Sequence, residues 1–567
     1  MIAEGAKSTE VSRRAPDLVM RLDRLGSFHQ SRLSFMRVLL RRIARENWRF
    51  SRPVFEIDEN GVGHAVYCAH GPERTYSLVA FAHDLPAEKR SDRVIAEAWD
   101  STFTLFDGVP DEDDIARLRD NVPLQEAGRV SEKELSLSRA NRSVRLWDHM
   151  VSSLAEGRQP DRAEVEKVGY LMRTTAVYGA GKFGAADREM IAARPECAAP
   201  FQIEMLSVYL TRTYVRDLMQ HMAQARGGSK TATLDAGIAL SLGIGNSTGL
   251  GMAPFLVNHP KLFNNWIAAR EEAIARVRSI EQASTEDIAL FRGLFERAMR
   301  SVALWSSEHP LQIEKLAVLR ADLATLSDHV QKADLTAWRP WDGLFLWSEA
   351  NLRADAQEWL ASLMLEPYGH LVDALATEMA DTDATAFRID GSMRLDRLQT
   401  VLEDAYGWAL NVDWSAKSQC ARAWYVSEEK LEPRLGERFD EPIADYEQPL
   451  APGRDAAALF QALRDQEPGM TVAEYLLAYP EHRHSVRRAQ IVARAPYAEI
   501  RDNTIGASLL PIDMLRCKLS FFGATHFDPR SDRWVRICMF GNAPYPEDLD
   551  SESGEFWVYP AVSDSAL

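Results

Sequence analysis

Residues Ala236 to Pro260 read AGIALSLGIGNSTGLGMAPFLVNHP, without a single Asp, Glu, Lys or Arg in a chain of which 26% is charged. The centre of this stretch, Gly243 to Gly251, places four glycines around Asn246, Ser247 and Thr248. Glycine is costly in regular structure and useful where the backbone turns sharply or approaches a neighbour closely. Apolar flanks favour burial, and a buried loop must pair its N–H and C=O groups. The stretch therefore predicts a buried glycine-rich loop, which either lines a ligand site or forms a tight turn between helices.

No other stretch is long enough and free enough of charge to raise the question of a membrane span. Its Gly, Asn, Ser, Thr and Pro content argues against a helix that faces lipid. The polar N-terminal residues show no secretory signal. We therefore expect no membrane insertion.

Composition excludes some classes of protein and favours others. The 567 residues carry a formal net charge of −17, which argues against a general nucleic-acid binder because such proteins displace counterions with positive charge. The five cysteines are scattered without a CxxC pair, which is typical of a reducing compartment and predicts a cytoplasmic location. The His482-Arg483-His484 motif lacks a spaced third ligand, so no metal site is predicted.

Hydrophobic periodicity decides the expected fold class. From Gln202 to about Leu375 apolar residues recur at helical spacing, which favours antiparallel packing in a bundle. Between Val54 and Phe106 apolar runs alternate around an Asn60-Gly61 turn, which predicts an antiparallel meander. Lys518 to Phe522 and Trp534 to Phe540 are interpreted as a second hairpin.

These patterns predict an α+β, predominantly α-helical fold, with a long central helix bundle and small antiparallel sheets contributed by the N-terminal and C-terminal regions. The expected divisions are a disordered tail (1–28), an N-terminal helix with the β meander (29–125), a helical core domain carrying the glycine-rich loops (126–410), and a C-terminal α+β region packing on the core (411–567).

A basic cluster precedes the helical region. Ser138 to Ser143 (SRANRS) is interpreted as the start of a helix, which places Arg139, Asn141 and Arg142 in its first turn. Cations oppose the helix dipole at that end, and an anion bound between the arginines would reverse the effect. The alternative is that both arginines pair with acidic neighbours.

A second glycine-rich loop, Gly179 to Gly184 (GAGKFG), follows Arg173. It lacks the GxxxxGK[ST] spacing of a phosphate loop, so a nucleotide site of that type is not predicted. Lys182 follows Tyr178 by four residues, and a nearby lysine lowers the pKa of a tyrosine. Tyr178 and Lys182 are therefore a candidate acid–base pair, with packing and surface charge as the alternative roles.

If these segments converge on one cavity, they form a site for an anion. The candidate catalytic residues are Tyr178, Lys182 and His259, and the candidate substrate-binding residues are Arg139, Asn141, Arg142, Arg173, Asn246, Ser247 and Thr248. The sequence thus predicts a soluble enzyme that uses metal-independent acid–base catalysis on a small carboxylate- or phosphate-bearing substrate, of the lyase, isomerase or hydrolase type. No cofactor is expected, and long apolar helix faces favour a homo-oligomer, in the simplest case a dimer.

Two other functions are compatible with the same residues. The glycine-rich loops suit a flavin- or nucleotide-dependent oxidoreductase with a flavin or nicotinamide nucleotide as its cofactor. Long helices and an acidic surface suit a non-catalytic helical assembly protein. A yellow colour of the purified protein would favour the first alternative, and an interior without a pocket at 243–251 would favour the second.

Overall fold

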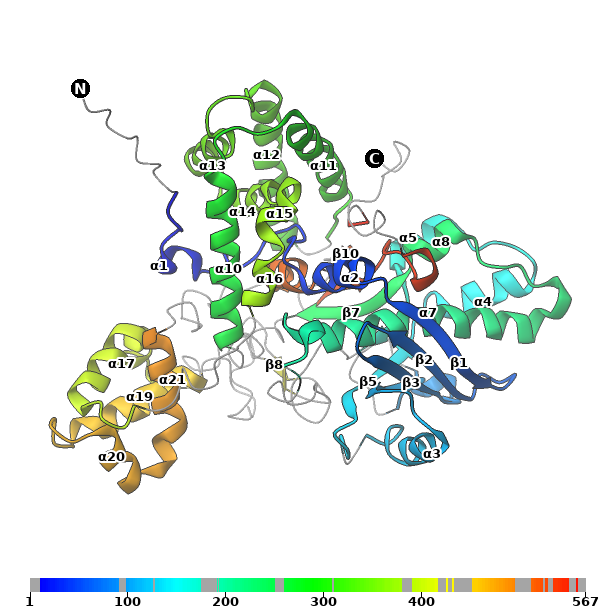
Figure 1. Ribbon diagram of the computed structural model, residues 1–567, viewed down its shortest axis with the longest axis horizontal. Coiled ribbons are helices and arrows are strands. Elements are labelled where there is room, and N and C mark those ends of the chain that lie inside the picture. The colour runs from blue at the N-terminus through cyan, green and yellow to red at the C-terminus, as the bar shows by residue number, and fades with distance from the viewer. Residues whose placement is uncertain are drawn as a thin grey trace. The chain divides into compact units, whose positions relative to one another are not determined.

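The computed structural model (Figure 1) describes residues 11–90, 98–125, 128–174, 191, 193–249, 260–307, 310–379, 390–416, 425–426, 431–432, 451–494, 511–523, 526–528, 534–549 and 557–558. The chain divides into two compact units. Unit 1 comprises Met1–Leu33, Thr248–Ser520 and Pro529–Trp534. Unit 2 comprises Ser34–Ser247, Phe521–Asp528 and Val535–Leu567.

Unit 2 is built on one large sheet, in the order β1-β2-β3-β4-β5-β6-β7-β11-β10. The strands are β1 (Arg49–Ile57), β2 (Gly63–His70), β3 (Thr75–Ala82), β4 (Ser101–Asp107), β5 (Glu134–Arg142), β6 (Tyr170–Thr174), β7 (Gly243–Gly249), β10 (His526–Asp528) and β11 (Trp534–Met539). Neighbours from β1 to β6 are antiparallel, whereas β6 and β7 run parallel, so the sheet is mixed. A separate pair joins β8 (Tyr425–Val426) to β9 (Leu431–Glu432).

The predicted fold class is therefore wrong. One nine-stranded mixed sheet replaces the small antiparallel sheets that were expected around a central helix bundle. The error arose where strands lack alternating apolar residues. Ser138 to Arg142 lies in β5 and not in a helix, and Gly243 to Gly249 is a strand and not a loop. Lys518–Phe522 is a π-helix, so the C-terminal hairpin joins β10 to β11 instead.

The predicted meander between Val54 and Phe106 is confirmed by β1 to β4. Its first hairpin turns at Gly61, which has φ of 79° and therefore suits a residue without a Cβ. The carboxylate of Asp58 accepts hydrogen bonds from the backbone N–H groups of Asn60 and Val62, both at 2.9 Å. Local turn chemistry thus fixes the register of the first two strands.

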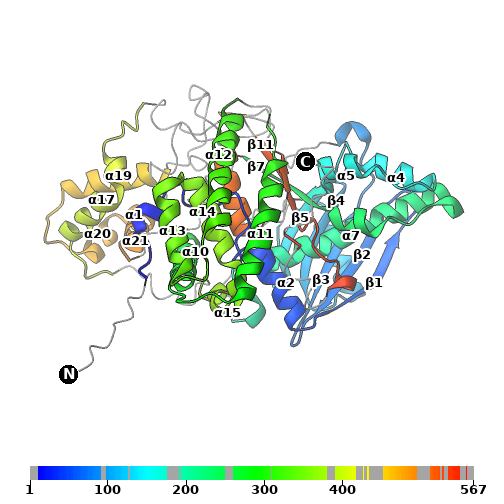
Figure 2. The same cartoon turned by 90° about the horizontal axis from the view of Figure 1, so that it is seen from above.

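Helix α7 (Gln202–Gly227) packs across one face of this sheet (Figure 2). The hydroxyl of Tyr214 is 3.0 Å from that of Ser101 on β4, and the two rings of Tyr214 and Phe103 are 5.4 Å apart. Arg212 of α7 donates to the carbonyls of Leu242 (2.6 Å) and Ala543 (2.7 Å), just before β7 and just after β11. One buried guanidinium therefore holds these two strands against the helix.

The other helices of unit 2 are shorter. They are α2 (Phe35–Arg45), η1 (Ala87–Lys89), α3 (Glu112–Asn121), α4 (Trp147–Ala155), α5 (Arg162–Val168), η3 (Pro195–Cys197), η4 (Gly228–Lys230), α8 (Ala236–Ser241), η8 (Lys518–Phe522, which begins in unit 1) and η9 (Pro546–Asp548). Helix α3 covers the face opposite α7. Its Leu118, with Val122 at its C-terminal end, packs against Val66, Val79 and Leu137 of the sheet. Both faces of the sheet are thus partly covered, which explains why β2, β3 and β4 are buried along nearly their whole length.

Unit 1 is mainly helical in its described part, which also contains the short β8–β9 pair. Its main helices are α1 (Pro16–Val19), α10 (Pro260–Arg278), α11 (Thr285–Ala303), α12 (Pro310–Lys332), α13 (Pro340–Asn351), α14 (Ala354–Met364), η5 (Glu366–Tyr368), α15 (Gly369–Val372), α16 (Leu375–Glu378) and α22 (Pro511–Cys517). Trp266, Trp341 and Trp359 are fully buried among them, and the indole of Trp341 donates to the hydroxyl of Tyr368 at 2.6 Å.

A network of buried charges joins the N-terminal segment of unit 1 to its helices. Glu358 on α14 is inaccessible to solvent and accepts hydrogen bonds from Arg14 (2.5 Å) and from Arg270 on α10. Arg24 lies 3.2 Å from the same carboxylate, and Arg14 also donates to Glu271. Burial alone would raise the pKa of Glu358, but the charges of Arg14 and Arg270 outweigh it and lower this pKa from 4.5 to about 2.

This pKa shift predicts that the contribution of Glu358 to the unfolding free energy depends on pH. Because the folded pKa is lowered, the stabilising contribution is complete above the unfolded value of 4.5 and is lost as pH falls toward about 2. We expect the difference in unfolding free energy between the wild type and Glu358→Gln to shrink from pH 5 to pH 3. Urea unfolding at each pH measures it, and a constant difference would contradict the assignment.

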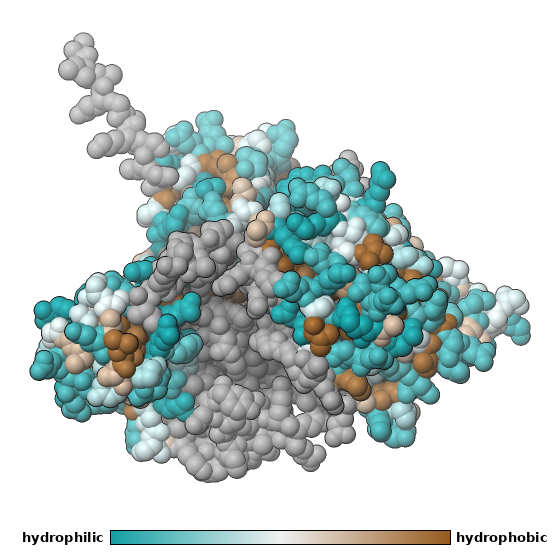
Figure 3. Space-filling view, turned by 60° about the horizontal axis from the view of Figure 1, so that its bottom comes forward, coloured by the Kyte–Doolittle hydropathy of each residue, from teal (hydrophilic) through white to brown (hydrophobic). Residues whose placement is uncertain are grey.

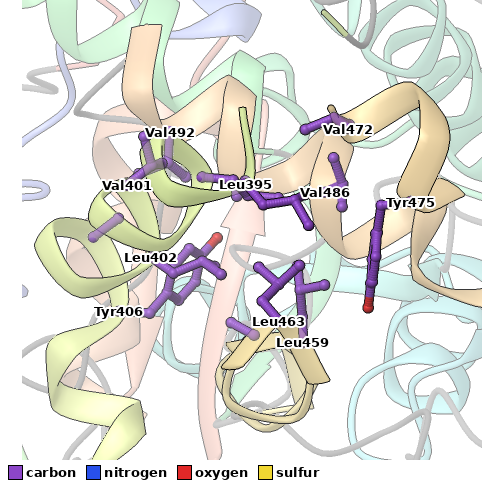
Figure 4. Close-up of a cluster of buried hydrophobic side chains, with 14 of the residues drawn as sticks. Leu395, Val401, Leu402, Tyr406, Leu459, Leu463, Val472, Tyr475, Val486 and Val492 are labelled. Carbon is purple, nitrogen blue, oxygen red and sulfur yellow. The ribbon is translucent and has the colours of Figure 1, made fainter. Parts of the chain in front are cut away.

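Four further helices of unit 1 form a group with a hydrophobic core of its own (Figure 4). This four-helix module consists of α17 (Leu395–Leu410), α19 (Ala451–Arg464), α20 (Val472–Ala478) and α21 (Arg483–Arg494), with η7 (Pro480–His482) between the last two. Leu402, Leu459, Tyr475 and Val486 are among its fully buried residues. A short backbone bridge pairs Arg394 with Thr471, so the segments that lead into α17 and α20 lie side by side.

None of the described helices combines the length and the apolar character that crossing a membrane requires. On the face drawn in Figure 3, hydrophilic residues predominate and hydrophobic ones are scattered. Scattered apolar side chains are normal on a folded surface.

Candidate functional site

Three of the predicted substrate-binding residues lie on one face of neighbouring strands in unit 2. In the sheet, Thr102 of β4 is opposite Arg139 of β5, and Asn141 of β5 is opposite Arg173 of β6. Residues opposite each other point to the same face, and residues two apart along a strand share it. Arg139, Asn141 and Arg173 therefore lie together with Thr102, and we call this group the arginine face.

Arg142 and Asn246 do not belong to the arginine face. Gly245 of β7 is opposite Arg173, so Asn246, the next residue, points to the other face. Arg142 is three residues from Arg139, which would put the two side chains on one side of a helix but puts them on opposite sides of a strand. The guanidinium of Arg142 lies 4.7 Å from the ring centre of Trp147. The helix start predicted at Ser138 is therefore wrong, because β5 is a strand, and Arg139 and Arg142 lie on opposite sides of it.

The glycine stretch is used for packing between strands. A Cβ at Gly245 would lie 2.6 Å from the ring of Tyr170 and 2.7 Å from Cγ of Arg173. A Cβ at Gly243 would overlap Cys538 and the carbonyl of Met539 on β11. The amide of Asn246 donates to the carbonyl of Thr174 at 2.9 Å. Glycine at these two positions thus lets β7 lie between β6 and β11 without overlap, which helps to position β6 and hence Arg173.

The structure does not describe the side chains of the remaining predicted site residues. Ser247 and Thr248 belong to β7, and their side chains lie outside the described part. Tyr178, Lys182 and His259, the predicted catalytic residues, also lie outside the described residues. Their roles stay predictions.

A buried carboxylate orders the strand ends at the arginine face. Asp100, just before β4, is inaccessible to solvent and accepts hydrogen bonds from the backbone N–H of Arg142 (2.9 Å) and from Nε of Arg90 (3.0 Å). Its own N–H donates to the side-chain oxygen of Asn141 at 2.9 Å. The ends of β4 and β5 are thus joined through side chains as well as through the sheet.

His83 is a residue of this site that the sequence reasoning missed. Its backbone N–H donates to the carbonyl of Asp100 at 2.9 Å, and its Nε2 lies 3.0 Å from the hydroxyl of Thr102. Burial lowers the pKa of His83, and the charge of Asp100 opposes this only in part. The imidazole is therefore neutral near pH 7 and able to accept a proton. Its place just after a strand was the only signal in the sequence.

The two arginines of this face are largely removed from water. Arg173 is 7% exposed. The guanidinium of Arg139 lies 4.1 Å from the ring centre of Trp99, and burial lowers its pKa to about 10, so it stays charged at neutral pH. Guanidinium groups with a fixed orientation bind carboxylates and phosphates through paired hydrogen bonds. The face therefore combines two cations, an amide and a neutral imidazole.

Among the described residues, no three His, Cys, Asp or Glu side chains are grouped so that they could hold a metal ion. No protein-family model matches the chain, and neither a curated protein nor a solved structure matches it. The fold and the site together define a mixed-sheet protein with a partly desolvated cationic face.

Proposed function

We propose that unit 2 binds a small carboxylate- or phosphate-bearing molecule at the arginine face, in an enzyme that acts by acid–base chemistry. The observation that carries this proposal is that Arg139 and Arg173, on adjacent strands, share a face on which both are substantially buried. Diagonal neighbours across an antiparallel pair are about 7–8 Å apart, a span that two long guanidinium side chains can close around one anion.

His83 is the residue proposed to accept a proton at this face. It reaches Thr102 by a hydrogen bond, and Thr102 is opposite Arg139. A neutral base beside two cations suits removal of a proton from a substrate whose negative charge the arginines hold. Tyr178 and Lys182, which follow β6 in the sequence, are the proposed proton-transfer partners. Lyases, isomerases and hydrolases all use such chemistry.

Ligand titration with matched arginine variants tests the binding step. Native mass spectrometry of the purified chain first identifies any retained ligand, and calorimetry then measures binding of inorganic phosphate and of succinate. We expect Arg139→Gln and Arg173→Gln each to weaken binding about tenfold or more, since hydrogen bonds to charged groups contribute about 1.5–3 kcal/mol.

Arg158→Gln is the control, because the Arg158 side chain is 66% exposed and pairs only with a surface carboxylate, that of Glu156, among described contacts. Its affinity should equal that of the wild type. The proposal fails if neither probe binds the wild type, or if all three variants bind equally well.

A further inference from the structure

Helix α21 of the four-helix module carries a basic outer face. Its twelve residues include four arginines and His484 but no acidic residue. Arg483, His484, Arg487 and Arg494 are exposed, and Arg488 is half-buried. The opposite side of the helix supplies Val486, Ala489 and Val492 to the core of the module. The core thus holds the helix in place while its basic face points outward.

Helix α20, the turn after it and α21 form a helix-turn-helix. Four residues, Tyr479–His482, separate the two helices, which is the spacing of this motif. The buried ring of Tyr475 packs against Tyr479 (5.0 Å between ring centres) and stacks on His482 (5.8 Å). The N–H of Tyr479 donates to the carbonyl of Tyr475 at 2.8 Å. Aromatic packing therefore fixes the turn.

The start of the motif is fixed as well. Thr471 and Glu474 form a capping box at the N-terminus of α20, in which each side chain bonds the other residue's backbone N–H. The carbonyl of Met393 accepts a hydrogen bond from Val472 at 2.8 Å, which ties α20 to the segment before α17. Helix α20, which precedes α21 in the motif, is thus fixed at its N-terminus.

We propose that α21 binds double-stranded DNA by entering its major groove. In DNA-binding helix-turn-helix proteins the second helix occupies this groove, whose width of about 12 Å accepts a helix of about 10–12 Å. The basic face supplies cations to the phosphates on either side. The deep, narrow major groove of double-stranded RNA does not accept a helix, so RNA is the disfavoured partner.

The net charge of −17 does not oppose this inference, although it predicted no nucleic-acid partner. Counterion displacement depends on the cations at the contact and not on the sum over the chain. An acidic peptide is a weaker fit to α21, because the exposed residues of this helix are basic or small and none is a large apolar side chain that would anchor a peptide.

Fluorescence anisotropy of a labelled 24-base-pair duplex with the full chain tests the proposal. We expect binding at about 50 mM salt that weakens roughly 40-fold at about 200 mM, the change for three phosphate contacts. The double variant Arg483→Glu/Arg487→Glu should bind at least about tenfold more weakly, with a shallower salt dependence.

Arg464→Glu is the matched control, since Arg464 is exposed on α19 of the same module and lies outside the motif. It should bind DNA nearly as the wild type does, and circular dichroism checks that all variants fold. Absence of binding by the wild type would overturn the inference. An equal loss of DNA affinity in the Arg464→Glu control would also overturn it. So would a finding that double-stranded RNA of the same sequence, or a polyglutamate peptide, binds as tightly as the DNA or more tightly.

Discussion

Replacing Glu358 with alanine is expected to lower the unfolding free energy of unit 1 by about 3–5 kcal/mol, the range for removing one partner of a buried ion pair. Arg14, Arg24 and Arg270 share this carboxylate, which is fully buried. Without it, Arg270 is left 2% exposed with one acidic neighbour, Glu271, at 3.7 Å among its described ion pairs. Removing one partner of a buried ion pair leaves buried charge that is only partly compensated, and this costs more free energy than the intact pair contributes.

Urea unfolding at pH 7 followed by circular dichroism measures this effect, and calorimetry shows whether it is confined to one transition. Glu272→Ala is the control in the same region. Glu272 pairs with Arg13 and Arg276, whose side chains are 53% and 40% exposed, and surface pairs of this kind contribute at most about 1 kcal/mol each. A Glu358→Ala protein within about 1 kcal/mol of the wild type would show that the network is not needed for stability.

Substituting Gly243 by valine is expected to destabilise unit 2 by about 3 kcal/mol, the upper end of the usual cost of overpacking. A Cβ at this position would overlap Sγ of Cys538 and the carbonyl oxygen of Met539, and it would lie 2.7 Å from the backbone N of Gly541. Two of these three atoms are backbone of β11 and the turn after it. They cannot yield without breaking the pairing between β7 and β11.

Thermal unfolding monitored by circular dichroism and intrinsic fluorescence tests this prediction. Gly293→Ala is the contrasting substitution, because a Cβ at Gly293 on α11 meets no atom within 4 Å. Alanine is favoured over glycine in a helix, so this change should stabilise the protein by about 0.5–1 kcal/mol. Unfolding of Gly243→Val at the temperature of the wild type would show that β7 and β11 leave room for a side chain at this position.

The candidate site was predictable only in part. The sequence singles out Arg139, Asn141 and Arg173, since they stand out as polar groups beside apolar runs, and their binding role stays a prediction. The arrangement of these residues could not be predicted, because Ser138 to Arg142 fits a helix start as well as it fits a strand. His83 gave no comparable signal. Its proposed role depends on Thr102 and Asp100, which the pairing of β3 with β4 brings alongside it.

The sequence by itself determined the elements with strong local signals: the strands around the Asn60-Gly61 turn and the long helices with apolar stripes. Those signals are contained within about ten residues, so neighbours in the chain suffice to form them. Only the tertiary structure decided that Gly243 to Gly249 is a strand, which face each arginine occupies, and that Arg14 meets Glu358, 344 positions away. Such contacts join residues that are distant in the chain, so they depend on the whole fold and cannot be predicted from local residue patterns.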